Sequence, residues 1–314
     1  MGTRRDQEKV IMYQWRYQRD TVNFEGVLNM DQKERLDYLV QYLCEDSVVY
    51  KDATVKDEQK RQIMRSLMNI RMPKPVSKEF IQIQDEFLQK EAVEKGIVKT
   101  DDLPTVKEML NVQFPFADRI CLWKGDITRL KADAIVNAAN SQMIGCFVPC
   151  HGCIDNAIHS SAGIQLRAEC MEYMEAQRKK YGEDYKEPTG QAVITNAYNL
   201  PSQYVIHTVG PIVKEELKQK ECDLLKKCYQ SCLEVAERKG LKSIVFCCIS
   251  TGEFAFPNKE AAQIAVETVV EFLQNSQKIE RVIFDVFKDE DFKIYQKILE
   301  LKEIKSHLTS KEKK

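Results

Sequence analysis

The sequence predicts an α/β protein in which a mixed, mostly parallel sheet lies between two layers of helices, with a helical extension at the N-terminus. After Pro104, Val- and Ile-rich runs alternate with stretches of helical periodicity, which is typical of parallel sheets covered on both faces. Residues 1–105 instead contain only three glycines and carry charges at helical spacing. We therefore divide the chain into a helical region, 1–105, an α/β domain, 106–302, and a charged tail, 303–314.

The N-terminal region is expected to form three or four amphipathic helices. Asp31 and Ser77 are placed to cap two of them, and Thr54 with Asp57 resembles a capping box for another. The residues that follow these caps at the 3.6-residue period are Leu36, Leu39, Val40 and Leu43, then Ile63, Met64 and Leu67, then Phe80, Ile83, Phe87 and Leu88. Because no chemical motif lies here, three roles stay open: covering a site, recognising a partner, or stabilising the sheet.

The elements of the α/β domain follow from its apolar runs. The predicted strands are RICLW, AIVNAA, QAVITNA, YVIHTVG, SIVFCCIS and RVIFDVF. Helices are predicted from Asp155 to about Tyr181, from about Lys214 to Lys239, from about Asn258 to Asn275, and after the last strand. Open α/β sheets bind ligands at the carboxyl ends of their strands. This rule selects the loops Gly125–Thr128, Ala138–Asp155, Thr208–Pro211 and Ser250–Phe256.

Composition disfavours several functional classes. Lys and Arg number 47 against 48 Asp and Glu, a net charge of −1 without a basic stripe, so no nucleic-acid partner is expected. Met1–Val10 lacks the apolar segment of a signal peptide, and the run around Ile244–Ile249 is too short to span a membrane. Eleven cysteines without a secretory signal indicate a reducing compartment. We expect a cytoplasmic protein, with no membrane partner, whose clustered cysteines serve metal binding or catalysis.

Five motifs resemble those of the macrodomain family, an ADP-ribose-binding α/β fold. The motifs GDIT, NAAN with its following loop, TGQAVITNAYNLP, YVIHTVGP and ISTGEFAFP occur in the family's order across roughly residues 118–300. In MacroD-type hydrolases a glycine-rich loop follows NAAN and holds the diphosphate. Here the run GCFVPCHGCID replaces those glycines. This departure and the long N-terminal region resemble the zinc-dependent subgroup of protein-ADP-ribose hydrolases.

The resemblance implies a set of ADP-ribose contacts. Asp126 takes the position of the adenine-contacting aspartate, with Ile127 offering a neighbouring amide, although Asp126 alone is more typical of a turn cap. Asn140 would meet the distal ribose and Asp155 matches the aspartate that hydrolytic relatives use there, which makes both catalytic candidates. The second diphosphate loop corresponds to Ser250, Thr251, Gly252, Glu253 and Phe254. Phe287 is a candidate for stacking on adenine.

The residue spacing favours three zinc ligands, Cys146, His151 and Cys153. Zinc prefers thiolate and imidazole ligands, and catalytic sites keep one position open. His151 and Cys153 are two residues apart and face the same side of an extended segment, while the adjacent Cys150 points away. Cys146 can fold back to meet them. A site with Cys150 as fourth ligand remains the alternative.

These features predict a zinc-dependent hydrolase that frees ADP-ribose from modified protein side chains. Zinc would act as a Lewis acid at the scissile C1″–O bond, while Asp155 accepts a proton or orients the ribose. The resemblance implies an O-linked, carboxylate-type substrate, modified by a sirtuin-like ADP-ribosyltransferase. The alternative is a non-catalytic ADP-ribose reader in which zinc only shapes the loop. A zinc-structured nucleic-acid module is the least favoured interpretation, because the charge is balanced.

Overall fold

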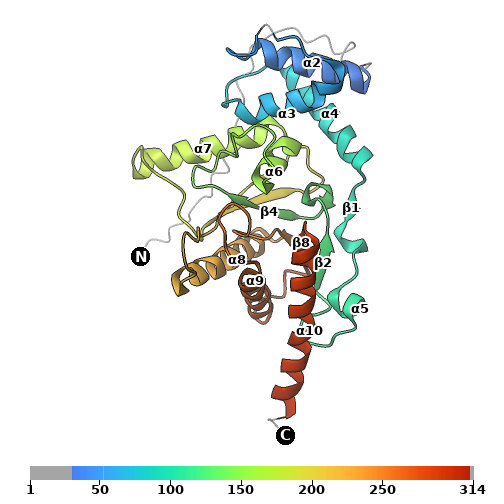
Figure 1. The fold of residues 1–314 in the computed structure, drawn as a ribbon, viewed down its shortest axis with the longest axis vertical. Helices are drawn as coiled ribbons and strands as arrows, with labels where there is room; N and C mark the ends of the chain where they lie inside the picture. Colours follow the sequence, from blue (N-terminus) through green and yellow to red (C-terminus); the bar gives the residue numbers. More distant parts are fainter. Residues whose placement is uncertain (1–29, 52, 312–314) are drawn as a thin grey trace, which may run out of the picture.

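The structure, a computed structural model, describes residues 30–51 and 53–311, and it confirms the predicted α/β architecture (Figure 1). The central sheet has the order β2-β8-β7-β4-β6-β5. Its strands are β2 Ile120–Lys124, β4 Ala134–Ala139, β5 Ala192–Asn196, β6 Tyr204–Val209, β7 Ser243–Phe246 and β8 Arg281–Val286. Neighbouring strands are parallel, except that β5 is antiparallel to β6. The interpretation of Met1–Val10 lies outside the described residues.

Helices cover both faces of this sheet (Figure 1). One face carries α6 Ile154–Ala162 and α7 Ile164–Tyr181, and the opposite face carries α8 Gln219–Lys239 and α9 Asn258–Leu273. Strands between two helical layers have few solvent-facing positions, and all four residues of β7 are buried. Short elements complete the domain: β1 Val98–Lys99 pairs with β3 Leu130–Lys131, and α5 Val106–Leu110 precedes β2.

Three helix boundaries differ from those predicted. The helix expected over 155–181 is broken at Gly163, whose φ of 95° is rare for other residues and whose missing Cβ leaves room for the side chain of Gln84. The next helix begins at Gln219 rather than near Lys214. The last helix, α10, spans Asp289–Lys311 and so includes most of the segment set apart as a charged tail. None of the helices within 30–51 and 53–311 is long and apolar enough to cross a bilayer.

Residues 30–51 and 53–95 form a separate N-terminal helical layer, with α2 Gln32–Glu45, α3 Lys60–Ile70 and α4 Lys78–Lys95. Asp31 caps α2 in a capping box, and Ser77 accepts a hydrogen bond from the Phe80 amide at the start of α4, as predicted. The capping box expected at Thr54 is wrong. A 3-10 turn, η1 Asp57–Gln59, precedes α3, and the carboxylate of Asp57 pairs instead with the Lys60 amine at 2.5 Å.

The N-terminal helical layer has its own apolar core and packs on the α6 and α7 face of the domain (Figure 1). Leu39, Met64 and Phe80 are fully buried in this core, which Ile164 of α7 joins. A buried amide pair, Gln84 Nε2 to Gln165 Oε1 at 2.7 Å, crosses the interface. The N-terminal helical layer therefore lies outside α6 and α7, on the side of the sheet where the cysteine-rich loop, Asn140 to Cys153, precedes α6.

Candidate active site

Parallel strands carry several of the predicted site residues to one edge of the sheet. Asp126 follows β2, Asn140 follows β4, and Ser250 lies beyond β7, while Phe287 directly follows β8. The carboxyl ends of these mutually parallel strands meet at the same edge. Phe287 is 78% exposed there, so its ring is free to contact a ligand. The sheet thus assembles the loops that the sequence selected.

Asp126 occupies the turn-capping position that its sequence context favours. Its Oδ1 accepts hydrogen bonds from the Thr128 amide at 3.0 Å and the Thr128 hydroxyl at 2.7 Å. Ile127 is buried, so its side chain serves the core. The cap fixes the loop after β2, and contact of Asp126 and Ile127 with an adenine stays a prediction.

The loop from Asn140 to Cys153 is folded by its own polar groups and by left-handed residues. Asn140 Oδ1 accepts from the Gln142 amide at 2.9 Å, and its Nδ2 donates to the Gly145 carbonyl at 3.2 Å. Met143 and Cys150 have positive φ, a strained conformation for residues with a Cβ. Gly145 has φ of 82°, and a Cβ there would lie 3.0 Å from the His159 ring.

The loop brings Cys146, His151 and Cys153 together. Their ligand atoms all lie within 4.8 Å of one another, and Cys146 Sγ is 3.7 Å from His151 Nδ1. A tetrahedral zinc ion with ordinary bond lengths separates a sulfur from a nitrogen ligand by about 3.6 Å. Two thiols and one imidazole at this spacing fit zinc. Burial raises the pKa of the Cys153 thiol to about 12, an effect that a cation bound between these residues would oppose.

Cys150 does not join the other three side chains. Its Sγ lies 3.1 Å from Ser66 Oγ and 3.5 Å from the Gln62 carbonyl oxygen, both in α3. The segment is not extended, as the spacing argument assumed: the His151 amide donates to the Val148 carbonyl at 3.2 Å and closes a turn, and the positive φ of Cys150 directs its side chain toward the N-terminal helical layer. The structure therefore groups the three residues preferred from the spacing and separates the fourth.

Asp155 lies in the first turn of α6, where it is 4% exposed. Its Oδ1 accepts a 2.7 Å hydrogen bond from Asn137 Nδ2, and its Oδ2 lies 3.5 Å from Asn140 Nδ2. Burial raises the pKa of the Asp155 carboxyl to about 6, although the Asn137 hydrogen bond opposes this shift. The two catalytic candidates, Asn140 and Asp155, are thus in direct contact.

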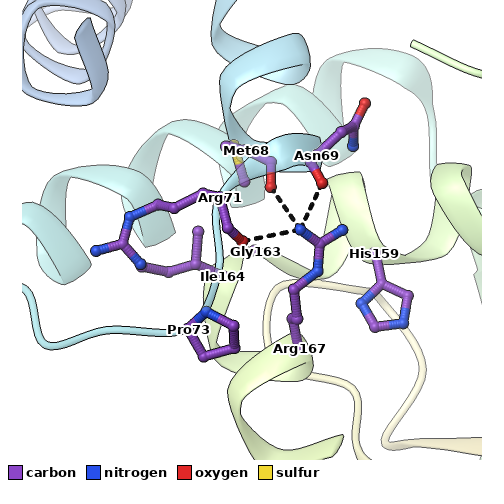
Figure 2. Close-up of a pocket in the computed structure, with 8 residues that line it drawn as sticks. All are labelled: Met68, Asn69, Arg71, Pro73, His159, Gly163, Ile164 and Arg167. Carbon is purple, nitrogen blue, oxygen red and sulfur yellow. Dashed lines mark hydrogen bonds between the residues drawn. The ribbon is translucent and has the colours of Figure 1, made fainter. Parts of the chain in front are cut away.

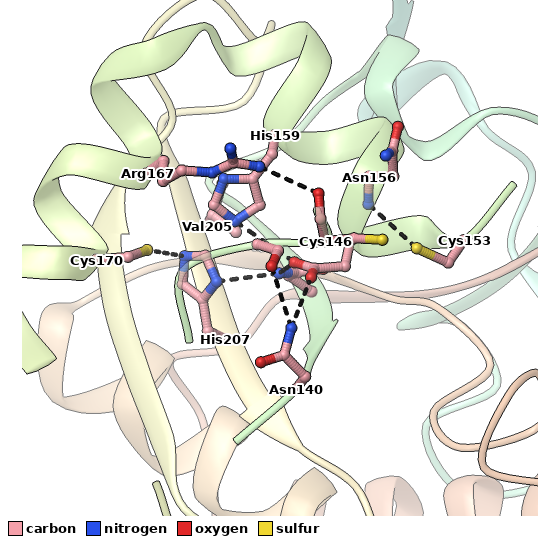
Figure 3. A network of polar contacts seen from close by, with 12 residues as sticks. Asn140, Cys146, Cys153, Asn156, His159, Arg167, Cys170, Val205 and His207 are labelled. Carbon is pink, nitrogen blue, oxygen red and sulfur yellow. Dashed lines mark hydrogen bonds and ion pairs between the residues drawn. The ribbon is translucent and has the colours of Figure 1, made fainter. Parts of the chain in front are cut away.

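Two buried histidines, His159 and His207, face each other next to the site (Figure 3). His159 Nε2 is 3.4 Å from Asp155 Oδ1, and His207 Nδ1 lies 3.1 Å from Asn137 Nδ2. His159, Cys170 and His207 also place their ligand atoms within 4.8 Å of one another. Asn137 and Thr195 already contact the two ring nitrogens of His207, whereas neither ring nitrogen of His159 has a hydrogen-bond partner among the described residues. The sequence assigned no role to Asn137, the first residue of NAAN.

The loop after β7 is tightly turned. Ser250 has φ of 67°, and its carbonyl accepts from the Phe256 amide at 3.0 Å. The Ser250 hydroxyl is buried and has no hydrogen-bond partner among the described residues. Gly252 is exposed and has open space where a Cβ would stand, so a ligand can approach its backbone. The partly exposed Phe254 follows, and Thr251 hydrogen-bonds the Cys248 carbonyl.

Glu253 links this loop to the cysteine-rich loop. Its Oε1 lies 3.6 Å from His151 Nε2, on the ring edge opposite the nitrogen that faces Cys146. At 3.6 Å the two groups are close but not hydrogen-bonded, and the Glu253 side chain is 73% exposed. The predicted role of Glu253 was a contact with ADP-ribose, which stays a prediction. The structure places its carboxylate beside His151.

Comparison with known proteins gives the same fold. A model of the Macro domain family matches residues 136–265. The Trypanosoma brucei macrodomain, in a crystal structure in complex with ADP-ribose, superposes with a TM-score of 0.54 and 30% identity, covering 74% of this chain and 94% of that chain. The similarity to the macrodomain fold is therefore present in both sequence and structure.

Two bacterial relatives extend the similarity. The protein-ADP-ribose hydrolase of Treponema medium is 46% identical over 272 residues, 86% of this chain and 100% of that protein. The protein of the same name from Staphylococcus aureus (strain MRSA252) is 41% identical over 269 residues, 84% of this chain and 94% of that protein. Both alignments are longer than the segment after residue 105, so they include part of the N-terminal region. The chain belongs to the macrodomain family.

Proposed function

We propose that this chain is a zinc-dependent hydrolase that releases mono-ADP-ribose from modified protein side chains, with a carboxylate-type O-linkage as its substrate. One observation carries the proposal: a Cys-His-Cys group and a buried carboxylate share the start of one helix. Cys153 is the N-cap of α6, and Asp155 lies in the first turn. The two bacterial relatives named protein-ADP-ribose hydrolases support hydrolysis as the activity.

Cys146, His151 and Cys153 would hold the zinc ion through two thiolates and one imidazole. A set of three protein ligands is typical of catalytic zinc, whereas structural sites use four. The chemistry that zinc supplies when bound is Lewis-acid polarisation of oxygen atoms next to the scissile bond. Cys150, turned toward α3, would not take part.

The remaining residues would bind and orient ADP-ribose. Asn140 and Asp155 lie where the distal ribose would bind, and the exposed backbone at Thr251 and Gly252 suits the diphosphate. Asp126, Ile127 and the exposed ring of Phe287 would contact the adenine. Contacts at both ends of ADP-ribose would hold the distal ribose near the Cys-His-Cys group, so that the reacting groups meet in a fixed orientation.

Hydrolysis would break the bond between C1″ of the ribose and the oxygen of the modified side chain. The oxygen of water joins C1″, the side chain leaves as a carboxylate, and one proton is released. Asp155 would accept that proton or hold the ribose hydroxyl in place, because its carboxylate lies next to Asn140. Both roles need the carboxylate, so Asp155→Asn should lose turnover and keep ADP-ribose binding.

The substrate and location follow from the same proposal. We place the substrate among proteins modified by a sirtuin-like ADP-ribosyltransferase, on the strength of the resemblance to the zinc-dependent subgroup. Thiolate ligands stay reduced in the cytoplasm, and all eleven cysteines are free thiols in the structure, which supports a cytoplasmic location.

The test is release of ADP-ribose from a protein mono-ADP-ribosylated on acidic side chains. Enzyme loaded with zinc and enzyme stripped by a chelator are compared, with metal content and ADP-ribose affinity measured on both samples. Turnover should be lost when zinc is removed and should return when zinc is added back, while both samples still bind ADP-ribose. Tight binding with no turnover in either sample would make the protein a reader with a structural metal. A serine-linked substrate serves as the control for linkage.

A further inference from the structure

Helix α3 of the N-terminal helical layer lies directly against the cysteine-rich loop. The Arg65 guanidinium donates to Asn156 Oδ1 from Nε at 3.1 Å and from Nη2 at 2.7 Å. The same Nη2 donates to the backbone carbonyl of His151 at 3.1 Å. The backbone amide of Asn156 in turn donates to Cys153 Sγ at 3.4 Å. Arg65 thus contacts the backbone of His151, one proposed ligand, and the side chain of Asn156, whose backbone amide hydrogen-bonds a second proposed ligand, Cys153.

One turn further along α3, Asn69 holds the middle of the loop. Its Oδ1 accepts from the Cys150 amide at 2.9 Å, and its Nδ2 donates to Ser160 Oγ of α6 at 2.9 Å. Asn69 is 1% exposed, so both hydrogen bonds are shielded from water. This contact fixes the left-handed Cys150, which sends the next residue, His151, toward Cys146.

A second guanidinium joins the C-terminus of α3 to the start of the loop. Arg167 of α7 is 4% exposed and donates from Nη1 to the carbonyls of Met68, Asn69 and Arg71. Figure 2 shows these bonds converging at the end of α3. Carbonyls at a helix C-terminus lack partners within the helix and carry partial negative charge, so a cation is favourable there. The other terminal nitrogen of Arg167, Nη2, donates to the Cys146 carbonyl at 3.1 Å.

We infer that α3 is a structural part of the proposed metal centre, with Arg65 and Arg167 as positioning residues that hold the backbone of His151 and Cys146. This inference rests on the proposed function, because it concerns the same three zinc ligands. The loop has no regular structure between Ala139 and Ile154 and includes strained left-handed residues, so its own sequence does not fix the ligand positions. Outer contacts of this kind set metal affinity by preorganising the ligands.

The N-terminal helical layer thereby has a second role besides apolar packing, which is to hold the cysteine-rich loop through polar side chains of α3. If the layer only covered apolar surface, its polar side chains would be free to face solvent. Instead three residues on one face of α3 contact the loop: the adjacent Arg65 and Ser66, and Asn69 about one turn later. The chain therefore uses a separately packed helical layer to hold the cysteine-rich loop.

The experiment compares Arg65→Ala with Arg61→Ala in the full chain. Arg61 is also in α3, one turn earlier, but pairs with Glu91 of α4 at 2.5 Å, away from the loop. Zinc affinity is measured by competition with a chromogenic chelator, and Co²⁺ loaded in place of zinc reports ligand geometry by its visible absorption. Arg65→Ala should weaken zinc binding by about 10–100-fold and shift the Co²⁺ spectrum, while Arg61→Ala changes neither. ADP-ribose affinity should be the same in both variants.

Equal zinc affinity and Co²⁺ spectra for the two variants and the wild type would overturn the inference and leave the proposed function intact. A wild-type protein that binds no zinc would instead overturn the proposed function. If Arg65→Ala does not fold, Arg65→Lys replaces it. A lysine keeps the charge but not the fork that spans Asn156 and His151, so its zinc affinity should lie between those of the wild type and the alanine variant.

Discussion

His207 should make the stability of this protein sensitive to mild acid. Its ring is fully buried in β6, with Nδ1 3.1 Å from Asn137 Nδ2 and Nε2 2.9 Å from Thr195 Oγ1. The Asn137 amide is a donor, so Nδ1 must be an acceptor and the imidazole neutral. A protonated ring would bring two donors face to face inside the core. Burial accordingly lowers the pKa of His207 from 6.5 to about 3.

The sign and size of the effect follow from linkage. Between pH 6.5 and pH 3 the unfolded chain binds a proton at His207 that the folded chain does not, so stability falls as the pH falls. Each pH unit in that window costs about 1.4 kcal/mol, and the change from pH 7 to pH 5 amounts to about 2 kcal/mol. The variant His207→Gln keeps hydrogen-bonding groups but has no charge to gain. Its loss of unfolding free energy between the two pH values should be smaller by that amount.

The assay is urea unfolding of wild type and His207→Gln at pH 7 and pH 5, both stripped of metal so that zinc release does not contribute. The quantity compared is the change with pH, so a lower absolute stability of the variant does not affect the result. Asp155, whose raised pKa acts in the opposite direction, is present in both proteins and cancels. An identical change with pH for the two proteins would refute the account of His207. Proton NMR should independently show this ring uncharged at pH 5.

Three further predictions concern the loop and the helical layer. If the proposed zinc site is correct, Cys150→Ser should keep zinc and turnover, because its side chain contacts Ser66 rather than the Cys-His-Cys group, while Cys146→Ser should lose both in metal analysis and release assays. Glu253→Gln should weaken zinc binding by about tenfold or less in a chelator competition, because the carboxylate beside His151 is largely exposed. Phe80→Ala should lower the free energy of unfolding by about 3–5 kcal/mol in urea, because this ring is fully buried.

The fold could be predicted because its signals are local. Strands between two helical layers read as continuous Val and Ile runs, and side chains at Asp31 and Ser77 cap the helices that follow them. The break at Gly163 was missed because apolar residues continue at helical spacing on both sides of it. What requires the glycine is the side chain of Gln84, which arrives from a distant part of the chain.

The candidate site divides in the same way. The spacing singled out Cys146, His151 and Cys153 on the assumption of an extended segment. In the structure, a turn and the positive φ of Cys150 separate its side chain from theirs, and residue spacing does not show either feature. The contacts of Arg65 and Arg167 with that loop join residues more than twenty positions apart, and a pattern of neighbours carries no sign of them. Asp126 shows the opposite case, since its capping bond to Thr128 was the expectation from local context alone.

The contacts around the site also explain how it tolerates strained backbone and buried ionisable side chains. Cys150 and Ser250 adopt left-handed backbone, and Asp155 and Arg167 are ionisable groups withdrawn from water. Each of these costs free energy that the surrounding structure must offset. On the sheet side, Asn137 offsets the burial of Asp155, and on the helical side α3 offsets that of Arg167 with three carbonyls. The cysteine-rich loop is held from both sides, by the sheet and by α3, which argues that the N-terminal helical layer and the macrodomain act as one unit.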